Sequence, residues 1–275
     1  MFASTISALG ALGLVAGGFL GTAQAVAPAG SPAGPAPAAA AAQTYGSTVS
    51  PQLRADVTPA FGQTVLSPAV HGKTVLVAGD SWAYHMADGM LAAVPQGQDT
   101  IVDAGGGGCG IMLPTTPGTP PICNTWQSQW PLLMTRYHPD AVILEISEWD
   151  ITPQQITAGG PMLNLTDPAY RARFVSNLDQ AVNILTAHDT PLYLENSKME
   201  GDKVFGPWAT IMNEILREFA QNRPNVHLLD VRDQLCEDEV CPPQLDGVKV
   251  YDPTGHTTPD ADRRLAVWAL NTMFA

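Results

Sequence analysis

From about residue 70 onward, the chain alternates short apolar runs with longer segments in which apolar residues return every three or four positions. The short runs predict β-strands, because their length and β-branched content are typical of strands. Their almost continuous apolar character is typical of parallel strands that are covered on both faces. The predicted strands span residues 74–78, 100–102, 141–146, 191–194 and 226–231.

The longer segments predict helices that lie between and after these strands. One helix follows directly on the first strand, from Trp82 to Val94, and another starts at Asp167-Pro168 with Phe174, Leu178 and Val182 on one face. Proline in the first turn is a common helix start, and Pro207 and Pro259 begin two more helices in the same way. Strands that alternate with helices predict an α/β fold with a mostly parallel sheet of about five strands and helices on both faces.

The charged residues divide the chain into two parts. The net charge is −13, yet the first 53 residues contain no Asp, Glu, Lys or Arg. Residues 6–20 are apolar and lead to Ala23-Gln24-Ala25, a pattern that signal peptidase accepts. We therefore predict an export signal over residues 1–25, which we favour over a retained membrane anchor, an Ala/Pro-rich linker over 26–49 and one domain over 50–275. The domain has no basic stretch, so nucleic acid is not an expected partner.

Four cysteines, Cys109, Cys123, Cys236 and Cys241, fit disulfides in an oxidising compartment. Three pairings are open, and Cys109–Cys123 with Cys236–Cys241 needs the least chain closure. A zinc site is the alternative, but the sequence has no CxxC pair or neighbouring histidine to support it. We therefore predict disulfides, with no metal and no organic cofactor. We also expect the protein to be secreted or associated with the cell envelope, outside the cytoplasmic membrane.

Ser81 is the first candidate for chemistry. It follows the first predicted strand in Gly79-Asp80-Ser81 and precedes a helix, so it lies at the carboxyl end of the sheet, where open α/β folds place their sites. Its N–H at the helix N-terminus is suited to stabilising a developing oxyanion. The alternative is that Ser81 only caps the helix.

Asp252 and His256 supply the groups that a serine nucleophile needs. They share a short loop just before the last predicted helix. A base takes the proton of the serine, and a carboxylate orients the base. The alternative is that His256 is a surface histidine. His85, one turn after Ser81, is expected to line the pocket.

These residues resemble the SGNH (GDSL) hydrolases, and more closely the SGNH-like domains of actinobacterial cell-envelope acyltransferases. The resemblance spans about residues 70–275 and includes Gly108-Cys109, Ser147-Glu-Trp-Asp150 and the Asp/His pair. It implies a three-layer, flavodoxin-like SGNH fold with Ser81 as nucleophile, His256 as base and Asp252 as the orienting acid. It also implies an oxyanion hole formed by the N–H groups of Ser81 and Gly108.

Two positions depart from the family pattern. The family separates acid from base by two residues, whereas three residues lie between Asp252 and His256. The alternatives to Asp252 are therefore Asp246 or no acid at all. The asparagine of the third family block is replaced by Trp149, whose indole N–H could donate in its place or whose ring could shape an acyl or sugar pocket together with Trp82.

The expected function is that of an exported serine esterase or O-acyltransferase that acts on an acylated envelope glycan or a small ester. The alternative is a non-catalytic envelope module that binds glycan or a partner membrane acyltransferase. We expect the protein to be a monomer.

Overall fold

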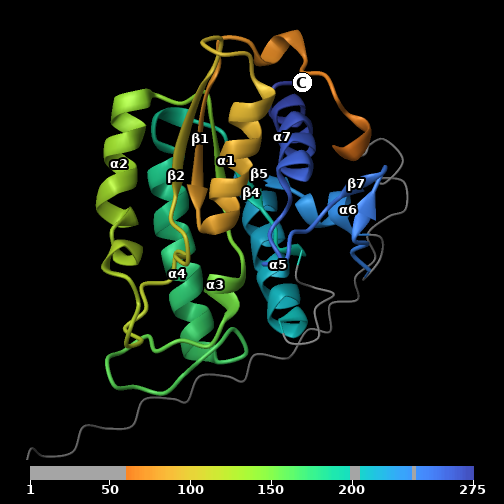
Figure 1. Cartoon of the computed structure of the whole chain (residues 1–275). Coiled ribbons are helices and arrows are strands. Elements are labelled where there is room, and N and C mark those ends of the chain that lie inside the picture. Colours follow the sequence, from red (N-terminus) through yellow and green to blue (C-terminus); the bar gives the residue numbers. More distant parts are fainter. Residues whose placement is uncertain (1–59, 199–204, 237–239) are drawn as a thin grey trace, which may run out of the picture. The chain divides into compact units, whose positions relative to one another are not determined.

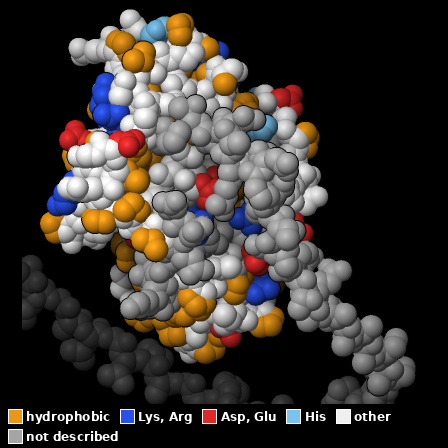
Figure 2. Space-filling view, turned by 90° about the vertical axis from the view of Figure 1, so that its right-hand side faces the viewer, with side chains coloured by type: hydrophobic (Ala, Val, Ile, Leu, Met, Phe, Trp, Pro, Cys, Tyr) orange, Lys and Arg blue, Asp and Glu red, His pale blue; other side chains and the backbone are white. Residues whose placement is uncertain are grey.

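The structure is a computed structural model that describes residues 60–198, 205–236 and 240–275. The predicted signal segment and Ala/Pro-rich linker lie outside the described residues. Throughout those described stretches, each helix is too short or too polar to span a lipid bilayer. On the face seen in Figure 2, Lys and Arg side chains are scattered among acidic, hydrophobic and neutral ones instead of gathering in one patch.

A five-stranded, wholly parallel sheet forms the centre of the domain, in the order β2-β1-β3-β4-β5. This is the flavodoxin-like order, in which the chain reverses direction across the sheet between β1 and β3. The predicted fold class is confirmed. The strands are β1 (Thr74–Gly79), β2 (Thr100–Gly105), β3 (Ala141–Glu145), β4 (Leu192–Glu195) and β5 (Val226–Leu229).

Helices cover both faces of the sheet, so that the domain has three layers (Figure 1). Successive strand residues point to opposite faces: Val75 and Val77 pack towards α1 (Ser81–Ala93) and α7 (Pro259–Met273), whereas Leu76 and Ala78 pack towards the other layer. That second layer contains α2 (Trp126–Tyr137), α4 (Pro168–Leu185) and α5 (Gly206–Gln221).

The observed strand ends differ from the predicted ones by one to three residues, and one helix was not predicted. The fifth strand ends at Leu229, because Asp230 caps the short helix α6 (Val231–Leu235) by accepting a hydrogen bond from the Asp233 N–H. Helix α2 was not predicted at all, since Pro131 interrupts its sequence pattern. The remaining elements are the short helix α3 (Glu148–Ile151) and the hairpin β6 (Gln244–Leu245) and β7 (Val248–Lys249).

Candidate active site

The turn from β1 to α1 places Ser81 at the carboxyl end of the sheet. Gly79 has φ +139°, and a Cβ there would lie 2.4 Å from the Glu145 backbone oxygen, so only glycine fits. Asp80, not Ser81, is the N-cap of α1, and its carboxylate accepts a 2.8 Å hydrogen bond from the Trp82 N–H. The capping role that was the alternative for Ser81 is therefore filled by its neighbour, which leaves the Ser81 hydroxyl for other contacts.

That hydroxyl meets His256, which lies 175 residues away in the sequence. Ser81 Oγ is 2.9 Å from His256 Nε2, and both side chains are partly exposed. His256 Nδ1 is 2.9 Å from Thr254 Oγ1, which is in turn 2.6 Å from Asp252 Oδ1. A single direction of donation fits all three bonds: Ser81 O–H to His256, His256 Nδ1–H to Thr254, and the Thr254 O–H to Asp252.

Thr254 thus lies between the predicted acid and the predicted base. Asp252 and His256 are joined directly only through the backbone, where the Asp252 N–H donates to the His256 carbonyl at 2.8 Å. The Asp252 carboxylate also accepts from the Thr254 N–H at 2.7 Å, which closes a turn typical of Asp. The Thr254 hydroxyl holds the pKa of Asp252 below its ordinary value. The sequence-based assignment missed Thr254, because a loop threonine has no spacing signature of its own.

Asp246, the alternative acid, lies in the hairpin turn between β6 and β7. It has φ +47° and precedes Gly247 at φ +77°, the conformation that an Asp-Gly hairpin turn needs. The hairpin turn therefore gives a structural reason for an Asp at position 246.

Two rings and a buried carboxylate position His256. Its imidazole stacks on His85 at a centroid distance of 4.7 Å and on Trp82 at 5.3 Å. His85 Nδ1 lies 3.1 Å from Asp262 Oδ2, and the other oxygen of Asp262 accepts the hydroxyl of Thr257, the residue next to His256. Asp262 therefore links residues 252–258, the loop that carries His256, to α1, the helix that begins with Ser81.

The close approach of α1 and α7 makes this tie possible. Gly89 lies one turn after His85, and a Cβ there would be 2.4 Å from the backbone oxygen of Asp262. Because glycine lets the helix backbones come together, the short side chain of Asp262 reaches His85.

The glycine loop after β2 lies beside Ser81. Gly105 pairs with Gly79, and the Gly106 N–H donates to the Gly79 carbonyl at 2.9 Å. Gly108 has φ +75°, and the nearest atom to a Cβ built on it is Cζ2 of Trp149, at 3.7 Å. Trp149 is 44% exposed, so its indole is both next to Gly108 and open to solvent. The structure thus brings Gly108 and Trp149 together at the edge of the site.

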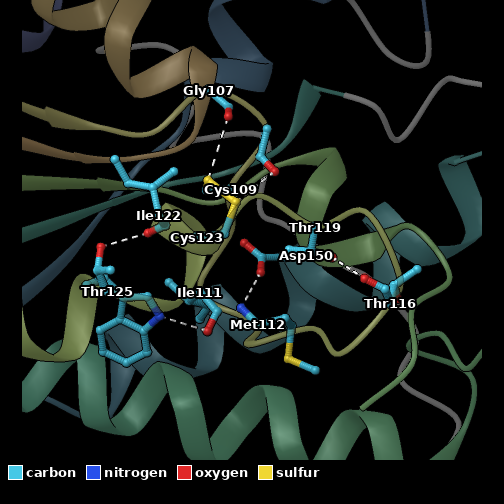
Figure 3. The surroundings of a disulfide bond; sticks show 12 residues. Gly107, Cys109, Ile111, Met112, Thr116, Thr119, Ile122, Cys123, Thr125 and Asp150 are labelled. Carbon is cyan, nitrogen blue, oxygen red and sulfur yellow. Dashed lines mark hydrogen bonds between the residues drawn. A yellow bond between two sulfur atoms is a disulfide. The ribbon is translucent and has the colours of Figure 1, made fainter. Parts of the chain in front are cut away.

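A disulfide and a buried carboxyl hold this loop (Figure 3). Cys109 is bonded to Cys123. Asp150 accepts a 2.8 Å hydrogen bond from the Met112 N–H and lies so close to Gly110 that a Cβ there would be 2.2 Å from its Oδ1. Burial raises the pKa of Asp150 to about 7, although backbone N–H groups oppose that rise.

Cys236 is bonded to Cys241, just after α6. Both observed disulfides are the pairs that need the least chain closure. In the parts of the chain that the structure describes, no group of three or more His, Cys, Asp or Glu side chains is arranged to hold a metal ion.

Behind Ser81 lies a carboxyl cluster, which we define as Asp80, Glu145, Glu148 and Glu195. Asp80, Glu145 and Glu195 are at most 4% exposed, and the last two are register partners at the ends of β3 and β4. Burial, followed by the neighbouring Asp80 carboxylate, raises the pKa of Glu145 well above its ordinary value. Burial also raises the pKa of Glu195, to about 8. The cluster was not predicted from the sequence, because a glutamate at a strand end usually faces water.

Lys198 is the cation of this cluster. Its ammonium group lies over the Trp82 ring, and burial lowers its pKa to about 7 while the four carboxyls oppose that fall. Trp82 also donates from its indole N–H to Glu148 Oε1 at 3.3 Å. Trp82 therefore separates the cluster from His256 and contacts both.

A family model described as "Protein of unknown function (DUF459)" matches residues 74–241, which include β1 to β5 and Ser81. The chain belongs to the DUF459 family. No curated protein sequence matches the chain significantly.

The solved structures that are distantly similar to this chain include two bacterial proteins. One is a presumed acylhydrolase from Bacteroides fragilis, with 15% identity, a TM-score of 0.46 and coverage of 82% of this chain and 95% of the other. The second is the periplasmic domain of a lipopolysaccharide acetyltransferase from Salmonella serovar Paratyphi A, with 13% identity, a TM-score of 0.43 and coverage of 70% and 80%. Neither likeness is close enough to assign a function, so the assignment depends on the site itself.

Proposed function

We propose that this DUF459 protein is a serine-dependent esterase or O-acyltransferase with Ser81 as nucleophile. The observation that carries the proposal is the 2.9 Å contact between Ser81 Oγ and His256 Nε2, continued through Thr254 to Asp252. A nucleophile next to a base, with the base oriented by a third group, is the arrangement that covalent acyl transfer requires.

In the first step, Ser81 Oγ attacks the carbonyl carbon of an ester while its proton passes to His256 Nε2. The tetrahedral intermediate then collapses: the bond from carbon to the alcohol oxygen breaks, and the departing alcohol takes the proton from His256. The positive charge that His256 carries in between is stabilised through Thr254, which accepts from His256 Nδ1–H and donates its own hydroxyl to Asp252. No proton leaves Thr254 in this step. Asp252 stays ionised to a lower pH than an ordinary Asp, which favours the imidazolium.

The second step releases the acyl group from Ser81. Water or a sugar hydroxyl loses its proton to His256 and attacks the acyl carbon, and Ser81 recovers the proton as the bond from its Oγ to that carbon breaks. In both steps the backbone N–H groups of Ser81 and Gly108 are the proposed oxyanion donors, with the Trp149 indole beside them.

The proposed setting is the cell envelope. Two disulfides are typical of proteins that fold outside the cytoplasm. An export signal over residues 1–25 would bring the domain there, and an acylated envelope glycan is the proposed substrate.

Hydrolysis of p-nitrophenyl esters by the full-length protein tests the proposal. We expect turnover to fall by at least about 10³-fold in Ser81→Ala and in His256→Ala. Ser67→Ala, which removes a serine at the start of a short helix at Pro68–Val70, is the matched control and should leave turnover unchanged. Equal turnover by wild type and Ser81→Ala would reject the nucleophile, and no turnover above background by the wild type would favour the non-catalytic binding module.

A further inference from the structure

A pocket of about 320 Å³ opens beside the glycine loop, on the side of Trp149. Gly108, the proposed oxyanion donor, and Trp149 line the pocket, and the Cys109–Cys123 disulfide forms one wall. The proline-rich loop over residues 114–120 and the segment 152–154 close the rest. A single water needs only about 10–15 Å³ of such space, so the pocket is far larger than a water site.

The chemistry of the lining excludes a charged ligand. None of the described residues that line the pocket is charged, and its apolar lining includes Met112, Trp149 and four prolines. An ionised group would lose its water here without gaining a partner. A neutral ligand is therefore the one that fits.

The lining also disfavours a sugar, because its polar side chains are already engaged. The Thr119 hydroxyl donates to the Thr116 carbonyl at 2.8 Å, and the Thr116 hydroxyl oxygen accepts from the Gln155 N–H at 2.9 Å. Thr152 donates to Glu148 O, and Gln154 Nε2 donates to Trp149 O and to the Tyr170 hydroxyl. A ring with several hydroxyls would leave many of them unpaired, which is costly when they are buried.

The position of the pocket decides which part of an ester it takes. In the tetrahedral intermediate, the oxyanion faces the donors at Ser81 and Gly108, and the alcohol oxygen faces His256, which protonates it. The described lining residues include Gly108 but no residue of α1 or of the loop that holds His256. The group that extends past Gly108 and away from His256 is the acyl chain.

We propose that this pocket binds an apolar acyl chain of medium length, so that the protein prefers such esters to acetates. The proposal rests on the proposed function, because it takes Ser81 as the nucleophile. It goes further by choosing the acyl chain over a sugar for the pocket beside Trp149, where the sequence left both open.

Chain-length dependence of turnover is the first test. With p-nitrophenyl acetate, butyrate and octanoate, the full-length wild type should show kcat/KM for octanoate that is roughly tenfold or more above that for acetate. Thr119→Phe fills the pocket and should lower kcat/KM for octanoate by roughly tenfold while that for acetate stays within about twofold. A wild type that prefers acetate, or equal losses on both esters, would overturn the proposal.

A matched control separates filling from the loss of a hydroxyl. Thr135, exposed on α2, donates to the Pro131 carbonyl at 2.9 Å, as Thr119 does to Thr116, but does not line the pocket. Thr135→Phe should leave both esters unchanged. If Thr119→Phe does not fold, Thr119→Leu is the smaller replacement and should give the same direction of change.

Binding to the Ser81→Ala variant tests the pocket without catalysis. Octanamide should shift the indole N–H resonance of Trp149, identified from its absence in Trp149→Phe, whereas acetamide at the same concentration should not. No shift with octanamide, or an equal shift in the Thr119→Phe background, would overturn the acyl pocket. An absence of Ser81-dependent turnover with the octanamide shift intact would instead reject only the proposed function.

Discussion

Carboxyl groups lie on both sides of the β1–α1 turn, but on one side the carboxyl is partly exposed and on the other the carboxyls are buried. On the outer side, Asp252 is partly exposed and bound to Thr254, and its pKa is lowered. On the inner side, Glu145 and Glu195 are buried among other carboxyls, and their pKa values are raised. One residue, Trp82, separates the two sides.

The comparison shows that closeness to Ser81 does not by itself make a carboxyl part of the catalytic chain. A buried carboxyl that holds its proton can donate a hydrogen bond, but it cannot stabilise an imidazolium as an ionised Asp does. The inner carboxyls adjoin the turn that carries Ser81, yet the hydrogen bonds of His256 lead outward, to Thr254 and Asp252. We therefore expect substitutions of Asp252 or Thr254 to change turnover. Substitutions of the inner carboxyls should change stability instead.

Within this comparison, the largest effect is expected for the hydrogen bonds that lead from His256 through Thr254 to Asp252. Asp252→Asn and Thr254→Val should each lower kcat by roughly 10- to 100-fold. In each variant, His256 Nδ1–H is no longer linked through a hydroxyl to an ionised carboxylate. Since both act through one chain of bonds, the double variant should be little worse than either single variant. Thr254→Ser should restore most of the activity.

Asp246→Asn is the control for that series, because Asp246 was the alternative acid and lies in a hairpin turn. Its turnover should match that of the wild type. Losses that add up in the double variant, or a large loss in Asp246→Asn, would contradict the role of Thr254.

A smaller effect is expected for Asp262, which links α7 to α1 through His85. Asp262→Asn should weaken the bonds to His85 and Thr257 and lower kcat by roughly tenfold, with KM unchanged within about twofold, because the base is less well held. Asp260→Asn makes the same change at an exposed position of the same helix turn and should have no effect. A loss of thermal stability with kcat intact would show that Asp262 is structural only.

The smallest effect on turnover is expected for Glu195. Its pKa is about 8 in the folded chain against an ordinary value of 4.5, so the folded protein keeps a proton that the unfolded chain releases. Stability should therefore fall as the pH rises from about 4.5 towards 8, by roughly 5 °C in Tm between pH 5 and pH 7. Lys198, with a pKa lowered to about 7, opposes this trend only near and above that pH.

Thermal melts of Glu195→Gln at pH 5 and pH 7 check this expectation. The difference in Tm between the two pH values should shrink relative to wild type, while turnover stays unchanged. Glu214→Gln, at an exposed position of α5, should keep the wild-type difference. An unchanged pH dependence in Glu195→Gln would mean that the buried carboxyl is not protonated.

The sheet and the place of Ser81 were predictable from the sequence, because apolar strand runs and helix start signals are local. Thr258 caps α7 and Pro259 opens it, as their order in the sequence indicated. By contrast, α2 was hidden by Pro131, which is unusual inside a helix.

The site was predictable only in part, for physical reasons that the residues illustrate. Ser81 and His256 occupy positions that a motif can mark, but Thr254 gains its role from the path of one turn. The burial of Glu145 and Glu195 depends on neighbouring strands and on Lys198, and contacts between distant segments leave no pattern within either segment.

The central claim is that His256 activates Ser81 as a nucleophile, and labelling with a fluorophosphonate tests it most directly. The reagent reacts with a serine oxygen by displacing fluoride, so the intact mass of the full-length protein should rise by one adduct, located on the peptide that contains Ser81. His256→Ala should be labelled at least about 100-fold more slowly. An absence of labelling, a label on another serine, or equal rates in wild type and His256→Ala would contradict the account.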